Sequence, residues 1–291
     1  MYVCMFHVKH ILHFRRRNLC RYGRMWYTKK VYERGVTVGK RIAVMNQKGG
    51  VGKTTTAVNL AACLAESGKR VLLVDADAQG NATSGIGVDK EQVKVSVYDI
   101  LINQTPTRKA IVPSKVKGLD VIAATISLAG AEVELVTIPQ REERMRSALL
   151  QVADRYDYML IDCPPSLGLM TVNVLVAADS VLIPIQAEYY ALEGVAQLLS
   201  TIRSVAQEWN PRLGVEGVLL TMYDGRTNLA LQVADEVKKY FRDKVYRTMI
   251  PRNVRLSEAP SYGEPIIMYD PRSKGAEVYR RLAQEVIARE A

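Results

Sequence analysis

The amino-acid sequence predicts a single α/β domain with a mostly parallel, twisted sheet that helices cover on both faces. Two observations carry this prediction. Short apolar runs of strand length alternate along the chain with longer helical patterns, an order typical of parallel sheets. Polar residues directly follow several of these runs, as expected where parallel strands end at a ligand crevice. The length of 291 residues suits one large domain of this class.

Basic residues are concentrated at the N-terminus. The chain carries 40 Lys and Arg against 30 Asp and Glu, which gives a net charge of +10 and a pI near 9.4. Nine of these bases but only one acid, Glu33, lie in residues 1–39, so 31 bases and 29 acids remain for the rest of the chain. If this nearly neutral remainder binds DNA, it must do so through a local patch, because the overall pI does not indicate one.

Residues 1–37 are expected to be a basic leader, either disordered or the product of a mis-assigned translation start, and residues 38–291 the folded domain. The leader has no helical or strand period and lacks the continuous apolar stretch of a secretory signal. Val38 can be encoded by GTG, which is also a bacterial start codon. The alternatives for the leader are a transit peptide, a basic arm that holds nucleic acid, and a metal site formed by His7, His10 and His13.

The remainder of the chain lacks several kinds of reactive group. From Lys40 onward it has no histidine and only two cysteines, Cys63 and Cys163. This excludes histidine acid–base catalysis, Ser-His triads and His-ligated metals there. The two isolated cysteines are expected to be reduced core residues of a cytosolic protein. No window approaches the roughly 18 apolar residues of a membrane span.

A glycine-rich loop follows the first apolar run, Arg41–Asn46, and precedes Ala57–Ala65, which is as rich in Ala, Leu and Val as a buried helix. Strand, glycine loop and helix together form the context of a phosphate-binding loop, in which backbone N–H groups and the helix dipole bind phosphate oxygens. The residues expected to contact the nucleotide are Lys48, Gly49, Gly50, Val51, Gly52, Lys53, Thr54 and Thr55.

This loop departs from the common phosphate-loop pattern. In G-x-x-x-x-G-K-[ST] the first glycine would fall at position 47, where this chain has Gln, and a second lysine, Lys48, follows it. Lys53 is expected to bridge the β- and γ-phosphates, and the Thr54 hydroxyl to ligate Mg²⁺. The loop therefore predicts an ATP-binding P-loop NTPase domain.

Carboxylates end two further buried runs, Arg70–Asp75 and Tyr158–Asp162. Because the carboxyl ends of parallel strands face one crevice, these acids are expected beside the phosphate loop. Asp162 ends a hydrophobic run in the Walker B pattern and is expected to hold the Mg²⁺ shell through water. Asp77, two residues beyond Asp75, is expected to lie near the γ-phosphate and to orient the attacking water.

The later part of the chain continues the alternation. Strands are predicted at Val181–Pro184, Val215–Thr221 and Val245–Ile250, with helices near 229–241 and 275–289. A further long helix, ended by Asn210 and Pro211, is expected to place one apolar face in the core or on a dimer surface. That face comprises Leu192, Val195, Leu199, Ile202, Val205 and Trp209.

From about Val38 to its C-terminus the chain resembles the ParA/Soj family of DNA-partitioning ATPases, within the ParA/MinD superfamily. Besides the deviant loop, the resemblance rests on motifs at 75–81 (D-x-D-x-Q-G-N), 162–166 (D-x-P-P-S), 188–194 (E-Y-Y-A-L-E-G) and 250–260 (I-P-R-N-V-R-L-S-E-A-P). Ala78 stands where the family commonly has Pro, which is expected to loosen the loop slightly without changing the chemistry.

The resemblance implies an ATP-dependent nucleotide-sandwich homodimer, in which Lys48 reaches the partner subunit's phosphates and Asp77 supports hydrolysis. It implies that Arg226 and Arg255 bind DNA without sequence preference. Met222 and Pro251 are expected near the adenine. The implied partners are a ParB-like protein that stimulates a slow ATPase and, in a regulatory role, a replication initiator. The implied location is the bacterial cytoplasm, on the nucleoid.

The same resemblance bears on the leader. Residues 5–10 can be back-translated into a string that contains TGTTTCACGTGAAACA, which looks like the centromere-like parS palindrome recognised by ParB. This favours translated upstream DNA as the origin of residues 1–37.

Three alternative functions are considered. A MinD-like membrane ATPase would need a basic amphipathic tail after the last core helix, whereas Val278, Leu282 and Val286 predict that the final helix is docked. An iron–sulfur carrier would need a cysteine pair, but Cys63 lies in a predicted helix and no C-x-x-C pair exists. A regulator whose ATPase times its binding to other proteins is compatible with partitioning, and the sequence does not separate the two.

Overall fold

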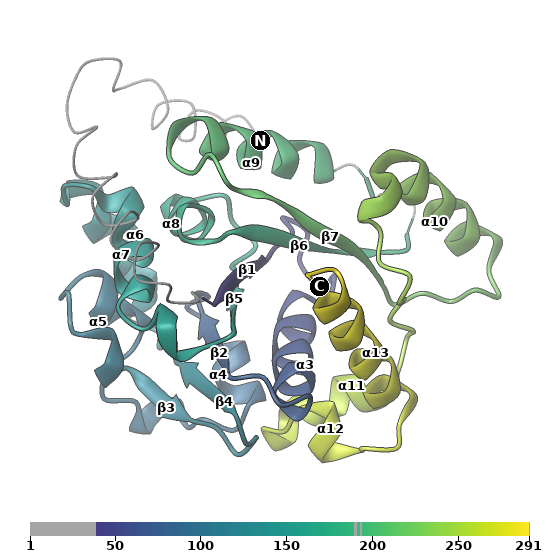
Figure 1. Cartoon of the computed structure of the whole chain (residues 1–291), viewed down its shortest axis with the longest axis horizontal. Coiled ribbons are helices and arrows are strands. Elements are labelled where there is room, and N and C mark those ends of the chain that lie inside the picture. Colours follow the sequence, from purple (N-terminus) through teal and green to yellow (C-terminus); the bar gives the residue numbers. More distant parts are fainter. Residues whose placement is uncertain (1–38, 189–190, 193, 291) are drawn as a thin grey trace.

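The framework of the protein is a seven-stranded sheet with the order β3-β4-β2-β5-β1-β6-β7 (Figure 1). The computed structural model describes residues 39–188, 191–192 and 194–290, so the leader lies outside the described part. All neighbouring strands are parallel except β3, which pairs antiparallel with β4 at the edge. The strands are β1 Lys40–Val44, β2 Val71–Asp75, β3 Ile111–Pro113, β4 Leu119–Ile122, β5 Tyr158–Asp162, β6 Ser180–Gln186 and β7 Gly214–Thr221.

Helices cover both faces of this sheet, as predicted (Figure 1). One face is covered by α3 Lys53–Glu66, α4 Asn81–Gly85, α11 Val254–Glu258, α12 Ile266–Tyr269 and α13 Lys274–Ala288. The other is covered by α5 Val97–Leu101, α6 Leu128–Glu134, α7 Arg144–Leu150, α8 Leu169–Ala177, α9 Val195–Glu208 and α10 Asn228–Phe241.

Strands β2 and β5 are apolar up to their final Asp because both of their faces are buried. In β1, Ile42 and Val44 pack into the core beneath α3 and α13, whereas Ala43 packs into the core beneath α8 and α9. Since successive side chains of a strand point to opposite faces, a run without polar residues supplies both cores at once. This explains why the runs ending at Asp75 and Asp162 read as continuous hydrophobic segments.

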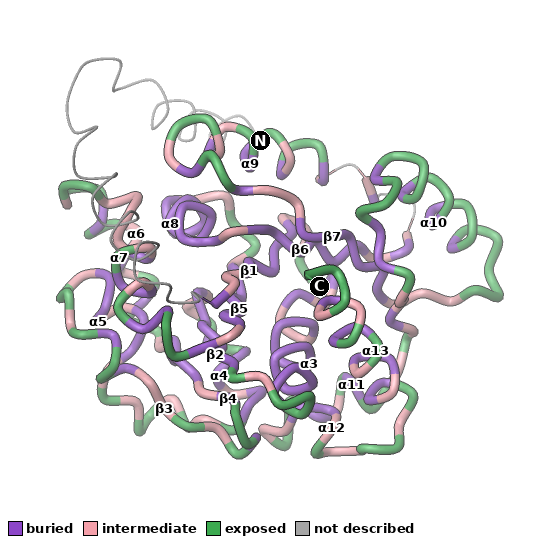
Figure 2. Tube along the Cα trace, viewed as in Figure 1, coloured by how far each residue is buried: buried purple, intermediate pink, exposed green. Residues whose placement is uncertain are grey.

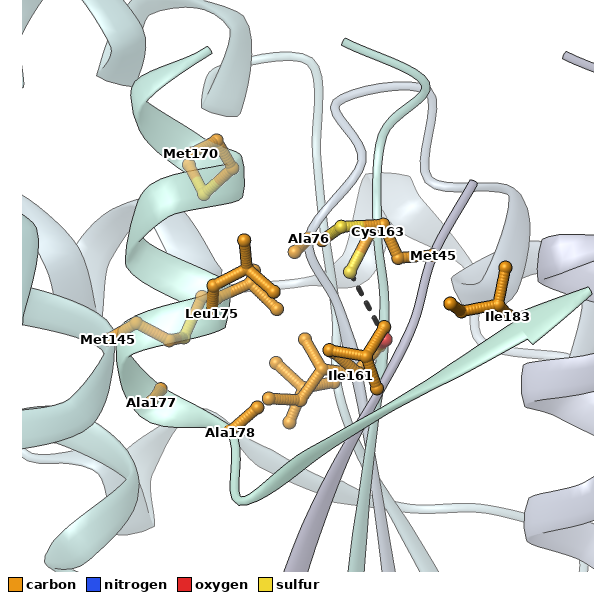
Figure 3. Close-up of a cluster of buried hydrophobic side chains, with 14 of the residues drawn as sticks. Met45, Ala76, Met145, Ile161, Cys163, Met170, Leu175, Ala177, Ala178 and Ile183 are labelled. Carbon is orange, nitrogen blue, oxygen red and sulfur yellow. Dashed lines mark hydrogen bonds between the residues drawn. The ribbon is translucent and has the colours of Figure 1, made fainter. Parts of the chain in front are cut away.

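Helix α8 is buried along its whole length, and Figure 2 shows it as a closed purple coil. Its Leu175 and Ala177 lie in one cluster with Ile161 of β5 and with Cys163, which directly follows that strand (Figure 3). The Cys163 thiol donates to the Ile161 carbonyl at 3.5 Å. Cys63 lies in the opposite core, and both cysteines are free and buried, as predicted. The sheet therefore separates the two thiols, which cannot share an iron–sulfur cluster within one chain.

The helices predicted near 229–241 and 275–289 are confirmed as α10 and α13, and Val278, Leu282 and Val286 are buried. Of the apolar face predicted for α9, Val195, Ile202 and Val205 are confirmed as core, and Leu198 is buried as well. The other predicted members are only partly buried, and two of them lie outside the helix: Leu192, Leu199 and Trp209. Within the described residues, no helix is long and apolar enough to cross a membrane.

The strand predicted at Val245–Ile250 is wrong. This segment runs along β7 but forms only isolated bridges, at Val245 and Pro251. Between them the N–H groups of Arg247 and Thr248 donate to the Glu285 carboxylate at 2.8 and 3.0 Å, so they are not available to a strand ladder. The N–H groups of Tyr246 and Ile250 still donate to carbonyls of β7, whereas a side chain of α13 accepts the two N–H groups between them.

Asn210, predicted only as the end of a helix, also donates hydrogen bonds to backbone carbonyls at the end of α8. Its amide nitrogen donates to the carbonyls of Ala178 and Leu175 at 2.6 and 3.0 Å, and the residue is buried.

We predict that Asn210→Ala lowers the free energy of unfolding by about 2 kcal/mol, because buried carbonyls would be left without their donor. Urea denaturation measures this. The exposed Asn103→Ala is the control, and an equal loss in both variants would contradict the assignment.

Candidate nucleotide site

The phosphate loop connects β1 to α3 and depends on two glycines in the left-handed region. Gly50 has a φ of 73° and Gly52, the residue before α3, a φ of 85°. A side chain at either position would be strained, so the tight curl of the loop requires glycine there. No atom lies within 4 Å of the Cβ positions of Gly49 and Gly50, which leaves open space on that side of the loop.

Two polar side chains that the sequence analysis missed fix this loop to the sheet. Asn46 donates from its amide to the Pro184 carbonyl at 2.7 Å, and its side-chain oxygen accepts from the Lys48 N–H at 3.0 Å. The Thr221 hydroxyl donates to the Val51 carbonyl at 2.8 Å. Both residues lie at the carboxyl ends of strands, like Asp75 and Asp162. A polar residue at the end of an apolar run could therefore have identified them in the sequence.

The two lysines of the loop have different surroundings. Lys53 is buried, and its ammonium donates to the Lys48 carbonyl at 3.1 Å. Burial lowers the pKa of Lys53, although the nearby charges of Asp162, Cys163 and Asp77 act to raise it. The Lys48 side chain is 39% exposed and pairs with Glu188 at 3.2 Å. Lys53 thus points into the site, whereas Lys48 is held at its rim.

Two acids stand fully buried at neighbouring strand ends. Asp162 accepts from the Thr54 hydroxyl at 2.7 Å through one oxygen, whereas its other oxygen has no partner. Burial, reinforced by the charge of Asp75, raises the pKa of Asp162 well above its usual range. Burial also raises the pKa of Asp75 to about 6, although Thr83 donates to this carboxylate from both its N–H and its hydroxyl, at 2.8 and 2.7 Å.

These surroundings fit a divalent cation beside a nucleotide. An unpaired buried carboxylate oxygen next to a hydroxyl lacks a positive partner, and Mg²⁺ prefers one or two such oxygens together with phosphates and water. Among the described residues, no three His, Cys, Asp or Glu side chains converge as a metal site. Thr54 and Asp162 would therefore hold Mg²⁺ only together with the phosphates.

Asp77 occupies a different position from the two buried acids. It is half-buried, and one of its oxygens accepts from the Gln79 N–H at 3.0 Å within a turn closed by Gly80 N–H to the Asp77 carbonyl. Its charge acts on the pKa values of both Lys53 and Asp162, so it lies near them. The three predicted acidic and basic groups therefore meet at one edge of the sheet.

Met222 and Pro251 lie on adjacent segments beyond this edge. The Tyr223 N–H donates to the Ile250 carbonyl at 3.0 Å, which places the two segments side by side. Thr221, which holds the phosphate loop, directly precedes Met222. The structure thus brings both residues predicted near the adenine close to the loop.

The predicted DNA-binding arginines lie on the surface. The side chain of Arg226 is 89% exposed and pairs with Asp224 at 2.7 Å, which lowers the pKa of that acid to about 2. The side chain of Arg255 is 55% exposed and pairs with Glu258 at 3.0 Å. Both guanidinium groups therefore have acidic partners that a phosphate would have to replace.

The cost of the unpaired carboxylate gives a stability prediction. Because folding raises the pKa of Asp162, the folded state holds this proton more tightly than the unfolded chain does, and stability falls as the pH rises through the folded pKa. Asp162→Asn removes this loss, so we predict that the free protein gains roughly 1–2 kcal/mol at pH 7.5. The same variant should lose most of the stabilisation that ATP and Mg²⁺ give.

Urea denaturation with and without ATP and Mg²⁺ measures both effects. Asp120→Asn is the control, because Asp120 already accepts from the Tyr156 hydroxyl at 2.7 Å and lies away from the loop. A free Asp162→Asn protein less stable than the parent would contradict the prediction.

Comparison with known proteins agrees with this geometry. A family model described as an AAA domain matches residues 39–215. The sporulation initiation inhibitor protein Soj of Bacillus subtilis is 65% identical over 86% of this chain and 99% of its own length. The chromosome partitioning protein ParA of Myxococcus xanthus is 55% identical over 89% and 92%.

Solved structures share the fold. A cobyrinic acid a,c-diamide synthase from Mycobacterium smegmatis with bound ADP and magnesium is 38% identical with a TM-score of 0.77, over 87% of this chain and 95% of that one. The cell division ATPase MinD of Pyrococcus furiosus is 26% identical with a TM-score of 0.72, over 87% and 100%. From its loop, its acids and these relatives, the chain belongs to the Soj/ParA family of chromosome-partitioning ATPases.

Proposed function

We propose that this protein is an ATP-dependent DNA-partitioning switch. ATP binding drives sandwich dimerisation and binding to DNA of any sequence, and hydrolysis stimulated by a ParB-like partner releases the DNA. The observation that carries this proposal is the pair of lysines in one phosphate loop. Lys53 is buried beside the loop, whereas Lys48 lies at the rim, where in the proposed dimer it would contact the second subunit's phosphates.

Residues 48–55 would bind the phosphates of ATP, with Thr54 and Asp162 holding Mg²⁺ and with Met222 and Pro251 beside the adenine. Related structures with bound nucleotide and magnesium support this assignment. Mg²⁺ supplies charge neutralisation for the transferring phosphoryl group. Lys53 and Lys48 would stabilise charge that develops on the phosphates, and Asp77 would orient the attacking water.

Hydrolysis by this protein alone is proposed to be slow. From Lys40 onward the chain has no histidine, and one oxygen of Asp77 already accepts from the N–H of Gln79 in its own turn. A ParB-like partner would then complete or rearrange the site. Because hydrolysis would be slow, the ATP-bound state would persist long enough to bind DNA.

DNA attachment is proposed to use Arg226 and Arg255. Each arginine would appear twice in a dimer, so pairs of weak phosphate contacts would act together. Residues 1–37 are proposed to lie outside the ATPase domain, residues 38–291. The name of the Bacillus subtilis relative, a sporulation initiation inhibitor, suggests a second role in the regulation of sporulation. For a role in the regulation of replication, a replication initiator is the proposed partner. The place of action would be the nucleoid in the bacterial cytoplasm.

Co-sedimentation with random-sequence DNA, in ATP and in ADP across a salt series, tests the proposal. Retention in ATP alone, falling steeply with salt, is expected, because phosphate contacts release counterions. Equal or absent retention in both nucleotides would leave a nucleotide-binding protein but would reject the DNA switch.

Charge removal tests the two arginines individually. We predict that Arg226→Ala or Arg255→Ala lowers the slope of log affinity against log salt by about 0.9 for each phosphate that the arginine would otherwise neutralise. Arg70→Ala is a matched control, because its side chain is also 55% exposed and paired with an acid, Asp157. If Arg226→Ala and Arg255→Ala both leave the slope unchanged, these two arginines do not bind DNA.

The Lys48–Glu188 pair gives a separate prediction. In the proposed dimer Lys48 must leave Glu188, and an exposed pair of this kind contributes up to about 1 kcal/mol. We therefore expect Glu188→Gln to lower the ATP concentration at half-maximal dimerisation by about two- to fivefold, measured by light scattering. Glu264→Gln serves as the control. A higher ATP requirement in Glu188→Gln would show that the pair assists dimerisation.

A further inference from the structure

The side chain of Lys90 reaches back to the turn that carries Asp77. This turn comprises residues 77–80, and Lys90 begins a short 3-10 helix, Lys90–Gln92, further along the chain. The Lys90 ammonium donates to the Gln79 carbonyl at 2.9 Å. A side chain from a separate element therefore holds the backbone of the turn from which Asp77 is proposed to orient the attacking water.

Local hydrogen bonds define the shape of the turn. One oxygen of Asp77 accepts from the Gln79 N–H at 3.0 Å, and the Asp77 carbonyl accepts from the Gly80 N–H at 2.9 Å. The Asp77 N–H donates to Asp75 at 3.2 Å. These three bonds join the turn to itself or to the end of β2, and none of them ties its far end to a neighbouring element.

The stem of Lys90 also packs against that far end. A Cβ at Gly80 would lie 2.6 Å from the Lys90 Cδ and 3.0 Å from the Ala124 carbonyl, so the backbone of the turn is enclosed between these two groups. Gly80 has a φ of 63°, a conformation that a side chain would strain. Lys90 thus covers one side of the turn, and the segment after β4 covers the other.

The segment that carries Lys90 is held in place from behind. A Cβ at Gly87 would lie 2.7 Å from the Gly263 carbonyl, so the two backbones are in close contact there. The Asp89 carboxylate accepts from the Glu91 N–H at 3.0 Å and caps the short helix. Lys90 therefore extends from an ordered support, and its hydrogen bond restrains the turn relative to the rest of the domain.

We infer that Lys90 is a positioning residue for ATP hydrolysis, an inference that rests on the proposed role of Asp77. Its hydrogen bond to Gln79 keeps the turn in the orientation in which Asp77 can align a water with the γ-phosphate. Without this bond the turn populates other orientations, and the rate falls because catalysis depends on the placement of the groups around the reacting atoms. Lys90 acts through the Gln79 carbonyl and not on the phosphates.

This role differs from nucleotide binding and from general stabilisation in the quantity that it affects. The phosphate loop, residues 48–55, is a separate segment, so the affinity for ATP should not depend on Lys90. Lys90 is only half-buried, so loss of its hydrogen bond should change the stability of the fold little. The turnover of bound ATP, in contrast, depends on the orientation of Asp77.

Lys90→Ala tests the inference in the full-length protein with Mg²⁺. We expect kcat, measured as phosphate release from radiolabelled ATP, to fall about three- to tenfold, the range that the loss of one hydrogen bond gives. The Kd for ATP, measured by calorimetry, should stay within about twofold of the parent value, and the melting temperature should change little. Lys94→Ala is the matched control, because Lys94 is an exposed lysine four residues further along the chain.

Two further variants separate positioning from other roles. Lys90→Arg should restore most of the rate, because arginine can also donate to the Gln79 carbonyl. In an Asp77→Ala background, Lys90→Ala should cause no further loss of kcat, since the two residues act on one step. A full additional loss in that background would show that Lys90 acts independently of Asp77 and would overturn the inference.

The other results also give a clear answer. If Lys90→Ala hydrolyses ATP at the rate of Lys94→Ala, the hydrogen bond does not position the turn. If Lys90→Ala mainly raises the Kd for ATP, Lys90 binds the nucleotide, and the inference is again overturned. If Asp77→Ala alone hydrolyses ATP like the parent, the proposed role of Asp77 fails and the inference fails with it, a result distinct from a failure of Lys90→Ala alone.

Discussion

The buried carboxylate of Asp162 is the constraint around which the functional part of the molecule is arranged. A charge at the end of a fully buried strand is costly unless a positive partner reaches it, and within the described chain only the Thr54 hydroxyl hydrogen-bonds to it. Lys53 approaches from the phosphate loop but is itself desolvated. The free protein therefore retains an electrostatic cost that a cation with its nucleotide would relieve, which couples the ligand to the strand ends.

Most of the fold follows from two patterns of apolar residues in the sequence. Continuous apolar runs define strands with two buried faces, and the spacing of three and four residues defines α9, α10 and α13. The failure at Val245–Ile250 has a physical reason, because Glu285, 35 or more residues further on, takes the N–H groups that a strand would need. The short strands β3 and β4 were not predicted, since three or four residues give too little pattern.

The site was predictable where chemistry restricts the choice of residue. Glycines with positive φ and acids at strand ends are visible in the sequence, and the structure brings them to one edge. Asn46, Thr83 and Thr221 were not, because their roles depend on hydrogen bonds to partners that only folding brings near them, namely Pro184, Ala124 and Val51. Their types are common at surfaces, and only the folded geometry distinguishes them.

Cys163 and Cys63 lie in the cores on opposite sides of the sheet, so their thiol reactivity could report the local opening of each helix layer. Burial raises the pKa of Cys63 to about 12 and that of Cys163 also upward, so both thiols are unreactive in the closed protein. In a chain with Cys4 and Cys20 replaced, a thiol reagent would label each remaining cysteine only when its own layer of helices lifts. The ratio of the two labelling rates would measure whether the layers loosen together or separately.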